Sequence, residues 1–175
     1  MNHDSTQLPT VLRARLLDAP LWEFAIALYG RDGVESACLV LQDEAGVDVC
    51  ELLWHSWLYH HGLTCAECLD PVRHWQHRVT APLRRLRRDL KPEASRHASV
   101  AKLRRTLQQA ELQAEREALS RLEHLALESE RLSALPSPLP GLTEFLAMRL
   151  QLQKKPHLSA LQTLESRLDP SRRPR

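Results

Sequence analysis

The fold depends above all on residues 20–62, PLWEFAIALYGRDGVESACLVLQDEAGVDVCELLWHSWLYHHG, which hold all the Trp and Tyr residues of the chain except Trp75. Apolar spacing predicts a first helix over 19–29 and a second over 34–45. Asp48 is the N-cap of a third helix, with Glu51 three residues later as in a capping box. Apolar side chains occupy most of the circumference of this third helix, so we expect it to be the central one.

A resemblance to a family rests on a set of short motifs in the same stretch. They are Trp22-Glu23-Phe24, Leu28-Tyr29, Gly33-Val34, Ala37-Cys38-Leu39, Leu41-Gln42-Asp43, Gly46 and Asp48-Val49. With them the chain resembles an uncharacterised family of short proteobacterial proteins, a domain of unknown function. The likeness is close over 20–62 and looser up to about Lys91, and Cys50 stands where the family pattern usually has Asn. The resemblance implies a helical bacterial protein and supplies no activity, cofactor or catalytic residue.

Composition indicates an all-α protein. The chain of 175 residues has five Gly and 43% hydrophobic residues, and Leu, Ala, Glu, Arg and Gln are abundant. No apolar run reaches the ~20 residues that cross a bilayer, and the first nine residues lack the basic start and apolar centre of a signal peptide. We therefore expect a cytoplasmic protein with no membrane contact, whose four cysteines are thiols.

Proline residues and cap-like motifs divide the rest of the chain into segments. A short helix is predicted over 63–68, and a further one from Pro71 to Lys91 that is kinked at Pro82. Residues 93–135 contain neither Gly nor Pro and predict a helix about 60 Å long. The expected architecture is a compact helical domain followed by one long helix and a C-terminal helix pair. Its segments are 1–91 (helical domain), 92–135 (long helix), 136–140 (Pro-rich linker), 141–169 (helix pair) and 170–175 (basic disordered tail).

Charge is distributed unevenly along the chain. Residues 1–70 carry three basic and eleven acidic residues, a net charge of −8, whereas residues 71–110 carry eleven basic and two acidic residues, a net charge of +9. The candidate basic patch comprises Arg84, Arg85, Arg87, Arg88, Arg104 and Arg105. Such a patch is typical of nucleic-acid binding, but no aromatic residue lies between 76 and 144 to stack on bases. We expect the acidic first segment to neutralise part of this charge.

The one metal-ligand pattern is formed by Cys65, Cys68, His74 and His77. Two thiolates followed by two imidazoles make a tetrahedral zinc set in principle. Only five residues separate the two pairs, however, and a polar helix face explains the histidines as well. We therefore expect neither a metal nor a cofactor, and zinc binding at 65–77 ranks third among the functions considered.

The candidate interaction surface is the apolar stripe of the long helix at Leu103, Leu107 and Ala110. If the helix is straight, this stripe needs a protein partner or a second copy, as in a coiled coil. If the chain bends at Ser95–Ser99 and packs back, it forms an antiparallel bundle instead. No catalytic motif is present. The favoured function is a non-enzymatic protein-interaction module acting through the long helix, with nucleic-acid binding through 84–105 as the alternative.

Overall fold

The computed structural model describes residues 7–168, with side chains from Thr10 onward. The basic tail expected at 170–175 lies outside the described residues. The predicted all-α class is confirmed, because one short antiparallel sheet is all that interrupts the helices of residues 7–168. In chain order the elements are α1 (Gln7–Leu17), α2 (Leu21–Tyr29), α3 (Val34–Ala45), α4 (Val49–His60), β1 (Leu63–Cys65), α5 (Asp70–Trp75), the π-helical turn η1 (Gln76–Thr80), α6 (Ala81–Asp89), α7 (Lys91–Ala94), α8 (Ala98–Glu128), β2 (Leu132–Ala134), α9 (Leu142–Arg149) and α10 (Lys155–Arg167). No helix of residues 7–168 is both long and apolar enough to span a membrane.

The described chain forms two compact units. Residues 7–67 and 123–168 belong to the first, which we call the core unit, and residues 68–122 form the second, the hairpin unit. The chain thus returns to the core unit near the end of α8. This partition differs from the boundary expected at Lys91, which stays a prediction about independently folding parts.

Helix α4 is the centre of the core unit, as its sequence predicts. The Asp48 side chain accepts hydrogen bonds from the backbone N–H groups of Cys50 (2.8 Å) and Glu51 (3.2 Å), which confirms the predicted cap. Every residue from Cys50 to Leu58 is buried. Helices α2, α3 and α9 and strand β1 pack around α4, so its side chains meet other side chains on all sides.

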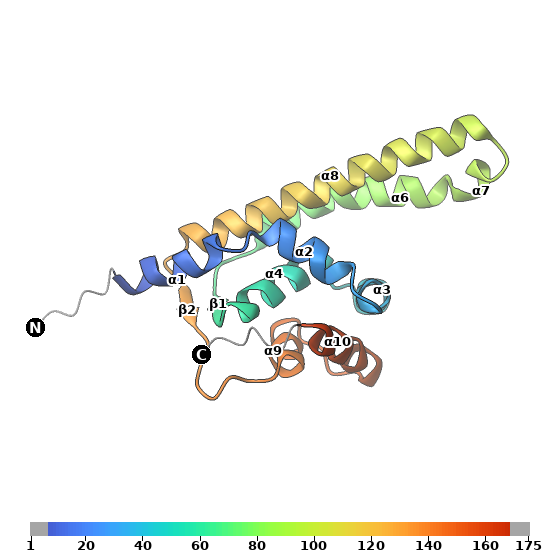
Figure 1. The fold of residues 1–175 in the computed structure, drawn as a ribbon. Coiled ribbons are helices and arrows are strands. Elements are labelled where there is room, and N and C mark those ends of the chain that lie inside the picture. Colours follow the sequence, from blue (N-terminus) through green and yellow to red (C-terminus); the bar gives the residue numbers. More distant parts are fainter. Residues whose placement is uncertain (1–6, 169–175) are drawn as a thin grey trace, which may run out of the picture. The chain divides into compact units, whose positions relative to one another are not determined.

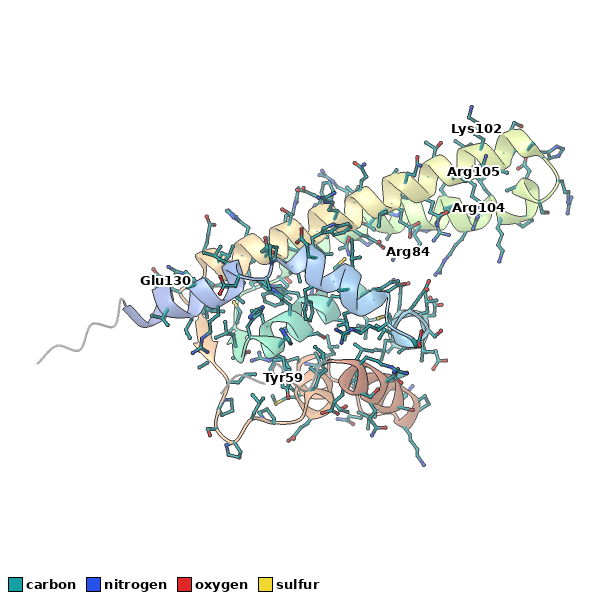
Figure 2. All side chains as sticks on the ribbon, viewed as in Figure 1. Tyr59, Arg84, Lys102, Arg104, Arg105 and Glu130 are labelled. Carbon is teal, nitrogen blue, oxygen red and sulfur yellow. The ribbon has the colours of Figure 1, made fainter. Side chains whose placement is uncertain are left out.

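Helices α9 and α10 complete the core unit, with α10 packed against both α3 and α9. Tyr59, labelled in Figure 2, donates a hydrogen bond from its hydroxyl to the carbonyl of Pro140 at 2.7 Å and so ties the Pro-rich segment to α4. Trp57 donates from Nε1 to the carbonyl of Ala19 at 2.7 Å. The two aromatic residues therefore fasten the segments before α2 and before α9 to the same helix.

The helix predicted over 63–68 is wrong. Leu63–Cys65 is a strand paired antiparallel with Leu132–Ala134, in the register Leu63 opposite Ala134. Cap-like spacing near Leu63 cannot outweigh backbone hydrogen bonds from a distant segment, and that segment is invisible to a local pattern. The same pairing shortens the predicted long helix at its C-terminal end, since the expected helical residues up to 135 include β2.

The single helix predicted over 93–135 is also wrong at its start. Helix α7 ends at Ala94, and α8 begins at Ala98 after a short turn. Helix α8 has 31 residues and is about 46 Å long at 1.5 Å per residue. It runs back alongside α6 (Figure 1), and hydrogen bonds between the two helices establish the contact. The alternative in which the chain bends near Ser95–Ser99 and packs back is therefore the one adopted.

Candidate interaction surface

The hairpin unit is built from α5, η1 and α6 on one side and the first 25 residues of α8 on the other. Two side chain-to-backbone hydrogen bonds establish its register. Arg104 donates from Nε to the carbonyl of Arg87 at 3.0 Å, and Trp75 donates from Nε1 to the carbonyl of Ala114 at 3.0 Å. The guanidinium of Arg121 covers the Trp75 ring, with Cζ 4.1 Å from its centroid. The aromatic residue of this unit is thus fully engaged at the base of the hairpin.

A π-helical turn lies directly before Pro82. Proline has no N–H, so the helix there loses one hydrogen bond of the ordinary ladder. In the structure the N–H of Ala81 bonds to the carbonyl of Gln76, five residues back, and the buried Thr80 hydroxyl lies 2.6 Å from Gln76 Oε1. The chain therefore stays helical through the proline by means of this widened turn.

Four charged side chains link α6 to α8. Arg84 donates from Nε to Glu111 Oε1 at 2.9 Å and from Nη2 to Glu115 Oε1 at 2.7 Å. Arg87 donates to both carboxylate oxygens of Glu111. Glu111 is buried, so this carboxylate depends on its two arginines for compensation. We call this group of four residues the ion-pair network.

The pKa values of the network follow from these contacts. Burial alone would raise the pKa of Glu111, but hydrogen bonds and charge from Arg87 and Arg84 outweigh it and lower the pKa. Burial likewise opposes the charge of Arg84, and its bonds to Glu111 and Glu115 raise its pKa in spite of it. Glu111 and its two arginines are therefore ionised at neutral pH. Its carboxylates come from α8, so the neutralisation of these two arginines takes place within the hairpin unit.

The remaining basic residues of the hairpin unit point mostly to solvent. Arg104 is half-buried, whereas Arg85, Arg88 and Arg105 of the predicted patch are exposed. Lys91, Arg96 and Lys102 are exposed as well. Figure 2 labels Arg84 on α6 and Lys102, Arg104 and Arg105 on α8. The predicted basic patch thus divides into a structural part, which holds the helices together, and an exposed part.

The predicted residues Leu103, Leu107 and Ala110 lie on one edge of α8. A helix turns by about 100° per residue, so Leu103 and Ala110 lie on one side of Leu107, and Arg104 and Glu111 lie on the other. The same spacing separates Leu83 of α6 and its C-cap residue Leu90 from Arg84. Since Arg84 and Glu111 bond to each other, the polar sides of the two helices coincide. The leucine sides therefore coincide on the opposite face of the hairpin.

We call this surface the apolar face; it comprises Leu83, Leu86, Leu90, Leu103, Leu107 and Ala110. Two of its leucines are far more exposed than a paired helix requires. Leu86 is 48% exposed and Leu103 is 51% exposed, and the others are half-buried. Helical spacing in the sequence predicts the α8 part of this surface. The same spacing does not predict that Leu86 is exposed, because buried leucines of other helices recur at the same helical spacing.

The four candidate zinc ligands occupy different kinds of element. Cys65 is buried on β1, Cys68 is exposed in the segment after it, and His74 and His77 are exposed on α5 and η1. Within residues 7–168, no group of three or more His, Cys, Asp or Glu side chains is close enough to hold a metal ion. The expectation of a metal-free protein remains a prediction, which elemental analysis of the purified chain would test.

Buried polar residues in the core unit offer little chemistry. Ser56 donates to the carbonyl of Leu52 at 2.8 Å, which is an ordinary helix contact. His55 packs against Trp54 and Phe145. Burial, together with the nearby charge of Glu35, raises the pKa of the Cys38 thiol to about 12, so this cysteine is not a nucleophile at neutral pH. The exposed features of the hairpin unit are therefore the stronger functional candidates.

Comparisons with known proteins give one match. No curated protein and no solved structure matches the chain. A family model described as "Protein of unknown function (DUF2390)" matches residues 20–122, which is more than half of the 175 residues. The match extends beyond Lys91, where the looser part of the resemblance in the sequence ended, and includes α2–α4 and the hairpin unit to its end. The chain therefore belongs to this family of proteins of unknown function, DUF2390.

Proposed function

We propose that the protein is a non-enzymatic cytoplasmic binding module and that it binds a protein partner, or a second copy of itself, through the apolar face of the hairpin unit. The observation that carries this proposal is the exposure of Leu86 and Leu103, on two helices but on one face. The family match supports it, because the matched region ends where the hairpin unit ends. The hairpin is thus part of the family's domain.

The physical reason lies in the number of neighbours. Each helix of an antiparallel pair has one partner, whereas a helix in a bundle has two or more. Burying a leucine completely contributes about 1.5–3 kcal/mol relative to leaving it in water. Exposed leucines facing the same way on two adjacent helices therefore offer a partner several kcal/mol of hydrophobic free energy. A contiguous patch of this kind marks interaction sites more often than plain surface.

Site-specific photo-crosslinking in cells tests the proposal. A photoreactive phenylalanine analogue is introduced at Leu86 or Leu103, and at Leu112 as the matched control. Leu112 is 55% exposed and also lies on α8, but five residues from Leu107 it points about 140° away. We expect a discrete crosslinked product from positions 86 and 103 and none from 112. Equal products from all three positions, or none from any, would contradict the proposal.

Nucleic-acid binding is the second candidate, favoured by the exposed cations Arg85, Lys91, Arg96, Lys102 and Arg105. Duplex binding at physiological salt with a steep dependence on salt concentration would support it. The Arg85→Ala, Arg105→Ala double variant leaves the ion-pair network intact and should then weaken binding and reduce the salt slope by about two. Weak binding that this variant does not change would exclude this candidate.

A further inference from the structure

We propose that the partner on the apolar face is an amphipathic helix of another protein, with leucine-like residues on one side and acidic residues along its flanks. This proposal rests on the proposed function and names the chemistry of its partner. Three features support it: the shape of the apolar face, the positive charge near it, and the presence of leucine and basic side chains together.

The shape of the apolar face suits a helix. Leu83 and Leu86 on α6 and Leu90 at its C-cap recur at helical spacing, and Leu103, Leu107 and Ala110 do so on α8. In a small helical bundle, a third helix packs over the seam between two such antiparallel rows. Recognition of a helix in a groove uses anchors at positions i, i+3 or i+4, and i+7 of the partner. An extended peptide would need an exposed strand edge, and the hairpin unit contains no strand.

The end of the hairpin unit where α6 and α8 are joined is strongly positive, although Arg87 there is paired with Glu111 and Arg104 lies on the same side of α8 as Glu111. Residues 85–105, which we call the hairpin tip, contain eight basic and two acidic residues, a net charge of +6. Lys102 is exposed and lies about 100° from Leu103 and about 80° from Ala110 around α8, so it flanks the apolar face. The acidic residues of the ion-pair network lie on the opposite face and are already engaged. An acidic partner is therefore attracted, and a second copy meets like charge at the tip.

The mixture of leucine and basic side chains favours a protein over a nucleic acid. Phosphates would satisfy the cations but leave Leu86 and Leu103 in water, since a duplex offers them little apolar surface. Single strands need stacking side chains, and Trp75, the aromatic residue of the hairpin unit, is already covered by Arg121. An acidic amphipathic helix uses both the leucines and the cations.

Three synthetic helical peptides of about three heptads test the proposal. They share one leucine stripe and carry Glu, Gln or Lys on both flanks, with a fluorescent label at one end. Binding to the full chain is followed by fluorescence anisotropy at low and high salt. Variants Leu86→Gln and Leu103→Gln remove the anchors, Leu112→Gln is the matched control, and Lys102→Glu reverses one flanking charge.

We expect the Glu-flanked peptide to bind at least about tenfold more tightly than the Lys-flanked one. Loss of either exposed leucine should weaken its binding about tenfold, and Leu112→Gln should leave it unchanged. Salt should weaken the Glu-flanked peptide, and Lys102→Glu should narrow the preference between the Glu- and Lys-flanked peptides.

Other results overturn the inference in distinguishable ways. If binding depends on the leucines but shows no preference for the Glu-flanked peptide, the inference of an acidic partner is rejected and the proposed function is retained. A dimer in light scattering that Leu103→Gln dissociates makes the occupant a second copy. Displacement of the Glu-flanked peptide by a short DNA duplex, with duplex binding insensitive to Leu103→Gln, makes it a nucleic acid. No difference between the wild type and the leucine variants for any peptide rejects the inference, and crosslinking at position 103 then decides the proposed function separately.

Discussion

Helices α4 and α6 show how differently two parts of this chain use apolar residues. Nine consecutive residues of α4 are buried, whereas no residue of α6 is buried. Helix α4 packs against α2, α3, α9 and β1, and its Trp57 and Tyr59 donate hydrogen bonds to backbone carbonyls outside the helix. Helix α6 is linked to α8 by arginine–glutamate pairs. The apolar side chains of α4 are thus buried in the core unit, whereas the hairpin unit leaves part of its own apolar surface exposed to solvent.

The largest expected effect is in α4. Trp57→Ala removes a fully buried side chain and its hydrogen bond to Ala19, and should lower the free energy of unfolding by about 4 kcal/mol. Urea denaturation measures it. A loss below about 1 kcal/mol would show that α4 is not the centre of the core.

The next effect is in the hairpin unit. Glu111→Gln keeps the shape of the side chain but removes the charge that Arg84 and Arg87 share, and should cost about 2 kcal/mol. The matched control is Glu117→Gln, which breaks an exposed pair with Arg121 on the same helix and should cost under about 0.5 kcal/mol. Equal losses in the two variants would show that the ion-pair network does not hold the hairpin.

The dependence of stability on pH should reveal the same carboxylate. The pKa of Glu111 is lowered by its arginines from an ordinary value of 4.5, so its contribution is complete above pH 4.5 and disappears as pH falls through the lower folded-state value. Unfolding measured between neutral pH and strongly acidic pH should show this loss in the wild type. The Glu111→Gln variant should show a flatter acid limb. Identical acid limbs would rule out the assigned shift.

A smaller effect is expected at the start of α4. Asp48→Ala removes the acceptor of two backbone N–H groups and should cost about 1 kcal/mol in urea denaturation. Asp48→Asn should restore most of this loss, because the amide oxygen can also accept. A loss as large as that of Trp57→Ala would mean that the carboxylate does more than cap the helix.

The parts of the fold that local patterns predicted are those determined by near neighbours in the sequence. Asp48 and the apolar positions of α4 lie within one helix, so its cap and its central place could be predicted. The pairing of Leu63–Cys65 with Leu132–Ala134 could not, because the two strands lie far apart along the chain. The turn after Ala94 was suggested only as an alternative, since no Gly or Pro marks it. Contacts such as Arg84 with Glu111 make the return of α8 favourable, and they appear only once the fold is known.

The candidate surface shows the same division. Helical spacing predicted that Leu103, Leu107 and Ala110 share one side of α8. The division of the basic patch into paired and exposed residues depended on Glu111 and Glu115, which local charge counting did not connect to Arg84 and Arg87. The exposure of Leu86 depends on which elements pack against α6. The spacing of apolar residues along one helix does not predict those tertiary contacts.

The measurement that tests the central claim most directly is the free energy of unfolding of the Leu86→Gln, Leu103→Gln double variant, at low protein concentration and without a partner. Leucine and glutamine have similar helix propensities, so the comparison reports burial. If these leucines form a binding surface, the double variant unfolds within about 0.5 kcal/mol of the wild type while losing its binding of the Glu-flanked peptide. A loss of about 3 kcal/mol or more would place both leucines in a core and contradict the account.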